Sequence, residues 1–204
     1  NDSSANSPQI LRAPWMKSYP RDVDWNAPIK GGSLPALMDK AVANFPNRIA
    51  TNFLGKQLTY GEIGNLVDRV AAGLQKIGVG KGVNVGLLLP NSPTFVVFYY
   101  GILKAGGTVV NFNPLYSVEE LVHQTRDSCI RLMITLNLKA LFPKVEALLT
   151  EGVLPQAVVC PFPELLPGIK ATAFRLLKRK QLVSWERSEM RSKIVPYHTL
   201  INND

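Results

Sequence analysis

The sequence contains no run of about 18 consecutive apolar residues, so no segment is expected to span a membrane. Residues 1–9 are polar and lack the basic start and apolar block of a secretory signal. The chain also begins without methionine, and we therefore expect a processed or excised piece of a protein. Its hydrophobic content of 46% is ordinary for a globular protein, which argues against disorder over most of the length.

Cysteine and histidine are both scarce. Cys129 and Cys160 each lie beside an apolar, strand-like run, and we expect both to be small buried side chains in a reducing compartment. His123 and His198 are the only histidines, and neither has a neighbouring ligand at metal-binding spacing. No metal site is therefore predicted.

Several motifs that mark common active sites are missing, among them G-x-x-x-x-G-K-[ST], G-x-S-x-G and H-E-x-x-H. The glycine-rich segment 78–82 comes between a predicted helix and the next strand, whereas ligands bind where strands run into helices. We interpret segment 78–82 as a helix exit followed by a tight turn. The sequence thus designates no catalytic, cofactor-binding or metal-binding residue.

The chain opens with a proline-rich segment, residues 1–32, that predicts an extended N-terminal arm. The arm contains three large aromatic residues, Trp15, Tyr19 and Trp25. An unfolded tail rarely carries two tryptophans, so we expect the arm to lie against the body of the protein.

A regular series of helix and strand patterns follows the arm. Ser33 can cap a helix over 34–45. Strands at 49–53 and 57–59 are predicted to form a small hairpin.

From residue 60 onward, helix and strand patterns alternate. The predicted helices cover 60–77, 93–103, 118–127 and 143–149, and the predicted strands cover 83–89, 108–112, 132–136 and 157–160. Two capping boxes, Thr59 with Glu62 and Ser117 with Glu120, mark helix starts. Such alternation implies an α/β fold with a mostly parallel sheet and helices on both faces, here an α/β subdomain over 33–160.

The net charge of +8 is concentrated late in the chain, in a tail region over 161–204. One amphipathic helix is predicted there, with apolar and basic faces. Its surface comprises Leu165, Leu166, Ile169, Lys170, Arg175, Leu176, Leu177, Lys178, Arg179 and Lys180. Such a helix can bind an anionic membrane surface, pack on another part of the protein, or contact a second copy in a homodimer. Nucleic acid is not an expected partner, because aromatic residues are not interleaved with the charges.

Two stretches carry a resemblance to a known family. Residues 58–63, LTYGEI, and residues 103–114, LKAGGTVVNFNP, resemble the first and second core motifs of the adenylate-forming superfamily. In the second stretch Gly106 is predicted to end a helix before a buried strand and a stop at Pro114. Residues 88–93 are also in the style of this superfamily. The N-terminal stretch from Pro14-Trp15 through Asp24-Trp25-Asn26 and residues 109–116 resemble, more narrowly, bacterial long-chain fatty-acid–CoA ligases.

This resemblance implies an enzyme that uses ATP, Mg and CoA. Such enzymes convert a fatty acid to an acyl-adenylate, and the CoA thiol then displaces AMP. The family's phosphate loop and later motifs are absent from this sequence. The resemblance therefore implies an N-terminal part of the enzyme that is inactive alone and binds none of these molecules tightly. From the cysteine usage we expect a cytoplasmic location, and membrane binding by the basic helix would place the protein peripherally on the inner face of the cytoplasmic membrane.

Two alternatives stay open. The parent protein could adenylate an aryl, short-chain or amino acid, since these residues do not settle the substrate. The chain could also be a non-catalytic α/β module that binds a membrane or a protein.

Overall fold

The computed structural model describes residues 14–24, 27–28 and 31–203, which fall in two units, Asn1–Gly32 and Ser33–Asp204. In the first unit, η1 (Pro14–Ser18) is a short 3₁₀ helix, and the Val23 amide donates to the Pro20 carbonyl at 3.1 Å. Trp25 lies outside the described residues. The expected packing of the arm stays a prediction.

The second unit begins with a helix and a hairpin. The helix α1 (Leu34–Asn44) starts at Ser33, whose side chain accepts a hydrogen bond from the Ala36 amide. The antiparallel strands β1 (Ile49–Phe53) and β2 (Lys56–Thr59) form the predicted hairpin. Its turn residues, Leu54 and Gly55, both have positive φ, as tight hairpin turns require.

Helices and strands then alternate as predicted. The helices are α2 (Tyr60–Lys76), α3 (Pro93–Ala105), α4 (Val118–Asp127) and α5 (Phe142–Thr150). The strands are β3 (Asn84–Leu87), β4 (Thr108–Asn111), β5 (Leu132–Leu136) and β6 (Gln156–Cys160). Both capping boxes are present, and Gly106 ends α3 in the left-handed conformation at φ 91°.

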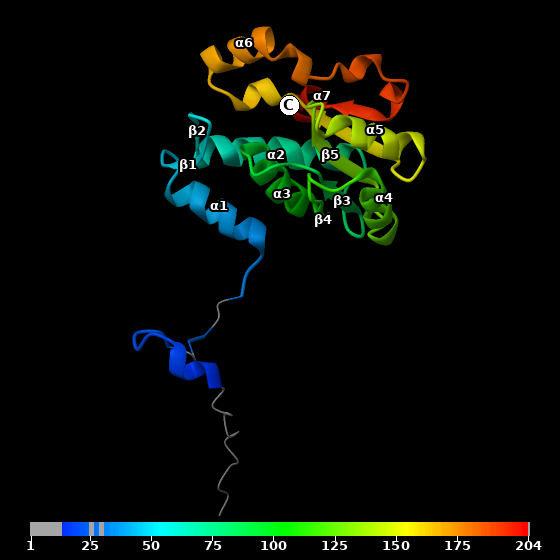
Figure 1. Cartoon of the computed structure of the whole chain (residues 1–204). Helices are drawn as coiled ribbons and strands as arrows, with labels where there is room; N and C mark the ends of the chain where they lie inside the picture. The colour runs from blue at the N-terminus through cyan, green and yellow to red at the C-terminus, as the bar shows by residue number, and fades with distance from the viewer. Residues whose placement is uncertain (1–13, 25–26, 29–30, 204) are drawn as a thin grey trace, which may run out of the picture. The chain divides into compact units, whose positions relative to one another are not determined.

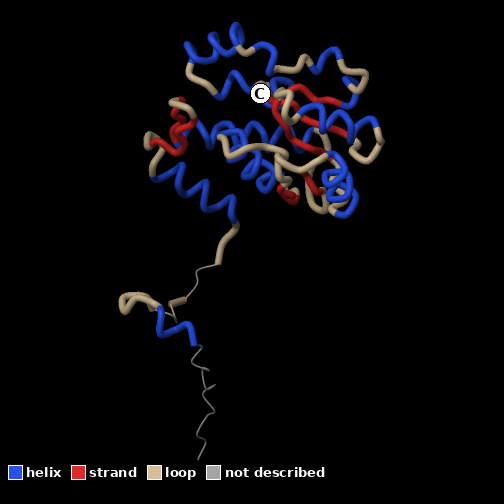
Figure 2. The backbone as a smooth tube through the Cα atoms, in the orientation of Figure 1, coloured by secondary structure: helices blue, strands red, loops and turns tan. Residues whose placement is uncertain are grey.

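The five-stranded sheet is parallel and has the order β4-β3-β5-β6-β7, where β7 (Ile194–Pro196) is its last strand (Figures 1 and 2). The crossovers through α3 and α5 move in opposite directions along the sheet. Because parallel crossovers are right-handed, these two helices lie on opposite faces. One layer contains α2, α3 and α7 (Tyr197–Ile201), and the other contains α4 and α5. The predicted fold class is confirmed.

The central strands carry the core. All five residues of β5 are buried, and Val85 and Leu87 in β3 are fully buried. Strand β4 differs from the prediction of a buried strand, since Thr108 and Asn111 are exposed. It lies at the edge of the sheet, where it pairs only with β3 among the described strands.

Two sequence predictions are wrong in their local detail. Cys129 is exposed, because it follows the C-cap of α4 with φ 49° and its thiol points to the Arg126 carbonyl at 3.4 Å. The single helix expected through Leu165 and Leu166 is broken at Pro167, so that η2 (Phe162–Leu165) is separate from α6 (Gly168–Leu177). Proline forces the preceding residue into an extended conformation.

Candidate functional site

A cavity of about 450 Å³ lies at the carboxyl end of β6. Its walls come from the hairpin, the first turns of α3, the segment from η2 to α6, and α7. The lining is largely apolar, with Leu58, Val97 and Phe98 among its members, and Lys56 and Arg175 add positive charge. Ligands of open parallel sheets bind at this edge of the sheet, so the position is that of a binding site.

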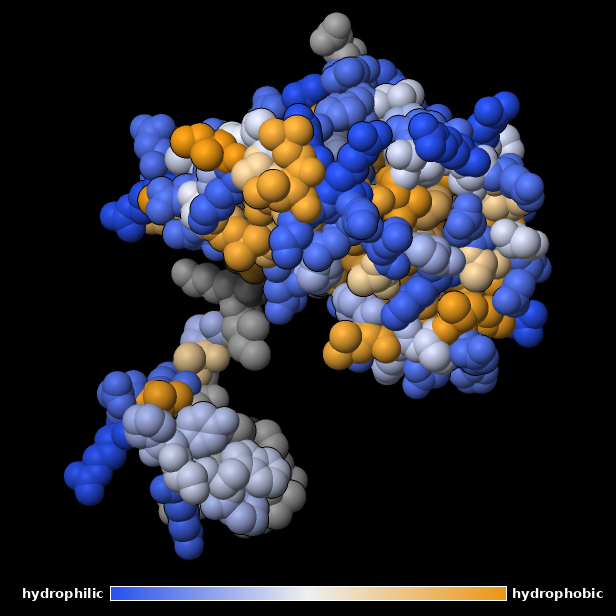
Figure 3. Space-filling view, turned by 45° about the horizontal axis from the view of Figure 1, so that its top comes forward, coloured by the Kyte–Doolittle hydropathy of each residue, from blue (hydrophilic) through white to orange (hydrophobic). Residues whose placement is uncertain are grey.

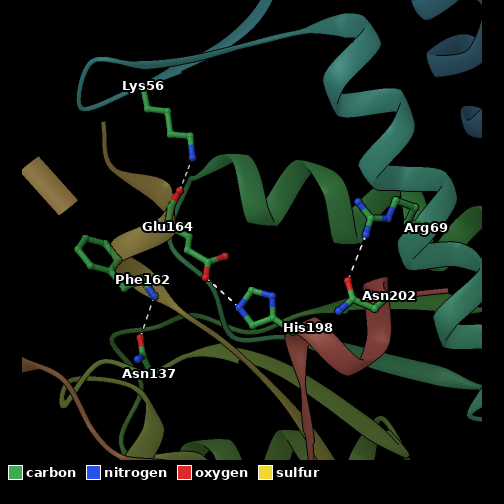
Figure 4. Close-up of polar contacts among 7 residues, drawn as sticks. All are labelled: Lys56, Arg69, Asn137, Phe162, Glu164, His198 and Asn202. Atoms are coloured by element: carbon green, nitrogen blue, oxygen red, sulfur yellow. Dashed lines mark hydrogen bonds and ion pairs between the residues drawn. The ribbon is translucent and has the colours of Figure 1, made fainter. Parts of the chain in front are cut away.

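Polar contacts hold the segment η2 over the end of the sheet (Figure 4). Lys56 Nζ donates to the carbonyl oxygen of Glu164, and the Glu164 carboxylate lies 2.9 Å from His198 Nε2. On the other side of the segment, the Phe162 amide donates to Asn137 Oδ1 at 2.8 Å. These contacts join β2, η2, α7 and the end of β5, and they fix the walls of the cavity.

The exposure of the Glu164–His198 pair limits its energetic contribution. The two side chains are 37% and 60% exposed, and exposed ion pairs contribute about 0–1 kcal/mol. We therefore interpret the contact as positioning of α7 beside η2.

Two ionisable groups near the cavity are shifted toward their neutral forms. Burial raises the pKa of the Cys160 thiol well above its ordinary value, and the Glu164 carboxylate adds to the effect. Burial likewise raises the pKa of Tyr197. A buried neutral thiol is a poor nucleophile, so this arrangement favours binding over covalent chemistry.

The structure separates the predicted basic and apolar surface into two parts. Leu165 and Leu166 are buried, at 8% and 6% exposure, and line the cavity. The exposed part consists of Ile169, Lys170, Arg175, Leu176, Leu177, Lys178, Arg179 and Lys180. Within it, Arg175 also reaches the cavity.

The glycine-rich segment 78–82 lies between α2 and β3, at the amino edge of the sheet and away from the cavity. Gly78 and Gly82 have φ of 89° and 81°, which fits a tight turn. Within the part of the chain that the structure describes, no group of three or more His, Cys, Asp or Glu residues could hold a metal ion.

Sequence reasoning missed the contacts of Lys56 and Glu164. These residues are 108 positions apart, and Glu164 and His198 are 34 positions apart. Only Pro161, Pro163 and Pro167, which exclude a long helix, marked this segment as unusual.

Comparisons with known proteins agree on one family. Residues 38–181 match the family described as AMP-binding enzyme. A long-chain-fatty-acid–CoA ligase of Bacillus subtilis (strain 168) is 37% identical over 169 residues, which cover 83% of this chain and 30% of that protein. This chain therefore spans less than a third of the length of that relative.

Solved structures show the same architecture. Coronafacic acid ligase from Pectobacterium brasiliense superposes with a TM-score of 0.65 at 16% identity, over 83% of this chain and 29% of that one, which shows the fold alone. The anthranilate CoA ligase AuaEII, in complex with anthranoyl-AMP, gives a TM-score of 0.57 at 25% identity over 74% of this chain and 27% of that one.

Proposed function

This chain belongs to the AMP-binding enzyme family of the adenylate-forming superfamily, and from that premise we propose that it is the N-terminal part of an ATP-dependent long-chain fatty-acid–CoA ligase. The observation that carries the proposal is the 37% identity over 169 residues to a ligase named for that reaction. The largely apolar cavity at the carboxyl edge of the sheet supports an apolar acid as substrate.

The proposed reaction has two steps. The fatty-acid carboxylate attacks the α-phosphate of ATP, which releases pyrophosphate and leaves an acyl-adenylate. The CoA thiolate then attacks the acyl carbon and displaces AMP. A carboxylate is a poor electrophile, and conversion of its oxygen to a phosphate leaving group makes the second step feasible.

We propose that this chain is inactive alone and contributes a scaffold. Its sequence lacks a phosphate-binding loop with lysine, and the described residues form no carboxylate cluster suited to Mg. In this proposal ATP, Mg and CoA bind to parts of the protein outside this chain. The second core motif, residues 103–114, supports this role, because it forms the end of α3 and the edge strand β4.

A second candidate is a ligase for an aryl or another carboxylic acid. The likeness to an anthranilate CoA ligase favours it, and the residues of this chain are compatible with either substrate. A non-catalytic module is the third candidate and predicts no adenylation by the whole protein.

Acid-dependent exchange between ATP and labelled pyrophosphate would distinguish these candidates. The whole protein should catalyse exchange with long-chain fatty acids and then form acyl-CoA when CoA is added, whereas the 204-residue chain should catalyse neither. Exchange with benzoate-type or amino acids but with no fatty acid would refute the proposal that the substrate is a long-chain fatty acid. Exchange by the 204-residue chain would refute its inactivity.

The proposed location is the cytoplasm. Two free cysteines, with the thiol of Cys129 exposed, suit a reducing compartment. Every helix in the described part of the chain is too short or too polar to cross a bilayer.

A further inference from the structure

One side of α6 is held by the rest of the protein. The Phe174 ring lies 5.0 Å from the Phe162 ring, and Lys170 Nζ donates to the Leu54 carbonyl at 2.8 Å. Ala171 and Arg175 line the cavity. These contacts orient the helix and leave its opposite side turned outward.

The outward side of α6 is apolar and uncovered among the described residues. Ile169, Leu176 and Leu177 are 89%, 75% and 83% exposed. Ile169 and Leu176 are seven residues apart, so they project from nearly the same side of the helix. Three large aliphatic side chains this exposed on one short helix mark an interaction surface.

Positive charge surrounds this surface. Between positions 165 and 185 the sequence contains five basic residues and no acidic residue. Lys178, Arg179 and Lys180 directly follow the helix and are exposed, and no carboxylate of the described residues forms an ion pair with them. In Figure 3 the part of the molecule that contains α6 comes forward, and hydrophobic side chains lie there beside strongly hydrophilic ones.

From this geometry we infer that α6 and residues 178–180 form a docking surface for an anionic phospholipid bilayer. The helix lies in the plane of the interface, its aliphatic side chains enter the acyl boundary, and the basic side chains contact headgroup phosphates. Charge complementarity and exposed aliphatic area together favour a bilayer as the occupant, whichever acid the whole protein activates.

The same charges argue against a second copy of the chain on this surface. In a two-fold dimer the same patch faces itself, so Lys178, Arg179 and Lys180 of one copy would approach the same three cations of the other. A bilayer with anionic lipids supplies the opposite charge and accepts aliphatic side chains without a shaped groove.

Flotation of the 204-residue chain with vesicles tests the inference. The chain should float with vesicles of phosphatidylcholine and phosphatidylglycerol, and much less with phosphatidylcholine alone. Each basic residue near an anionic leaflet strengthens binding about fivefold, so a triple variant, Lys178→Gln with Arg179→Gln and Lys180→Gln, should bind roughly 100-fold more weakly. A second variant, Ile169→Ser with Leu176→Ser and Leu177→Ser, should also lose most binding.

A matched control removes the same charge from the other edge of the sheet. Lys76, Lys81 and Arg131 are exposed and precede β3 and β5, whereas α6 follows the carboxyl end of β6. Their triple substitution by glutamine should leave most of the binding intact. Thermal unfolding should be unchanged in all three variants, because each substituted side chain is exposed.

Three results would overturn the inference. The first is equal flotation with neutral and anionic vesicles or with neither. The second is an equal loss of binding in the control triple variant, which would show that binding depends on net charge and not on where the cations lie. The third is a dimer in sedimentation that the aliphatic triple converts to monomer, which would identify a second copy as the occupant.

Discussion

Gly73 lies in α2 where α7 crosses it, and a methyl group at this position has no room. An ideal Cβ on Gly73 would lie 1.9 Å from the Leu200 carbonyl oxygen, whereas ordinary contacts begin at 3.4 Å. The Leu200 backbone would have to withdraw by about 1.5 Å. We therefore predict that Gly73→Ala displaces α7 from α2, although alanine is the better helix former.

The magnitude follows from what α7 buries. Leu200 and Ile201 are 2% and 8% exposed, and burial of each side chain stabilises the fold by about 1.5–3 kcal/mol. The hydrogen bond from Arg69 Nε to the Ile201 carbonyl at 2.8 Å would also be disturbed. Alanine recovers about 1 kcal/mol of helix propensity. The expected net loss in the free energy of unfolding is about 2–5 kcal/mol.

Urea unfolding followed by circular dichroism measures this loss. Gly168→Ala is the matched control, since Gly168 begins α6 and an added Cβ there meets no atom within 4 Å. The control should be neutral or more stable by up to about 1 kcal/mol. In a chain shortened to Pro196, Gly73→Ala should become stabilising, because the obstructing carbonyl is gone. An unchanged or higher urea midpoint for Gly73→Ala in the 204-residue chain would refute the reasoning.

Two further predictions concern titration and thiol reactivity. The hydrogen bond from the Thr59 amide and, second, the one from the Thr59 hydroxyl lower the pKa of Glu62. The ionised Glu62 side chain therefore stabilises the fold above the unfolded pKa, and this contribution is lost as pH falls through the folded pKa. Wild type should therefore exceed Glu62→Gln in urea midpoint at neutral pH, and the two should converge as pH falls through the lowered pKa of Glu62; a constant difference would contradict this. An aromatic disulfide reagent should modify the exposed Cys129 rapidly in the native chain and Cys160 only in urea, because Cys160 is buried and burial raises its pKa. Cys129→Ser should remove the fast phase, and a fast phase that persists would show that Cys160 is accessible.

Features fixed by neighbouring residues could be predicted from the sequence. The capping boxes at Thr59 and Ser117 bring together groups three positions apart, and Gly106 ends its helix by its own conformational freedom. The alternation of helices and strands was long enough to predict the parallel sheet.

Features fixed by distant residues could not be predicted in this way. Strand β7 and α7 have three and five residues, too short for a periodic pattern, and they form because β6 and α2 supply partners. The cavity depends on Lys56 and His198, both of which contact Glu164. Sequence rules favour a break at Pro167, whereas the apolar periodicity across it favours one continuous helix, and in the structure the proline prevails.

The packing of α7 on α2 also affects how the chain folds during synthesis. About 120 residues separate the end of α2 from the start of α7, and β7 joins the sheet only just before α7. During synthesis, the apolar flank of α2 around Gly73 and Leu74 leaves the ribosome long before its cover exists. The nascent chain therefore carries an unshielded, aggregation-prone flank until α7 emerges, and a factor that shields nascent chains would act in that interval.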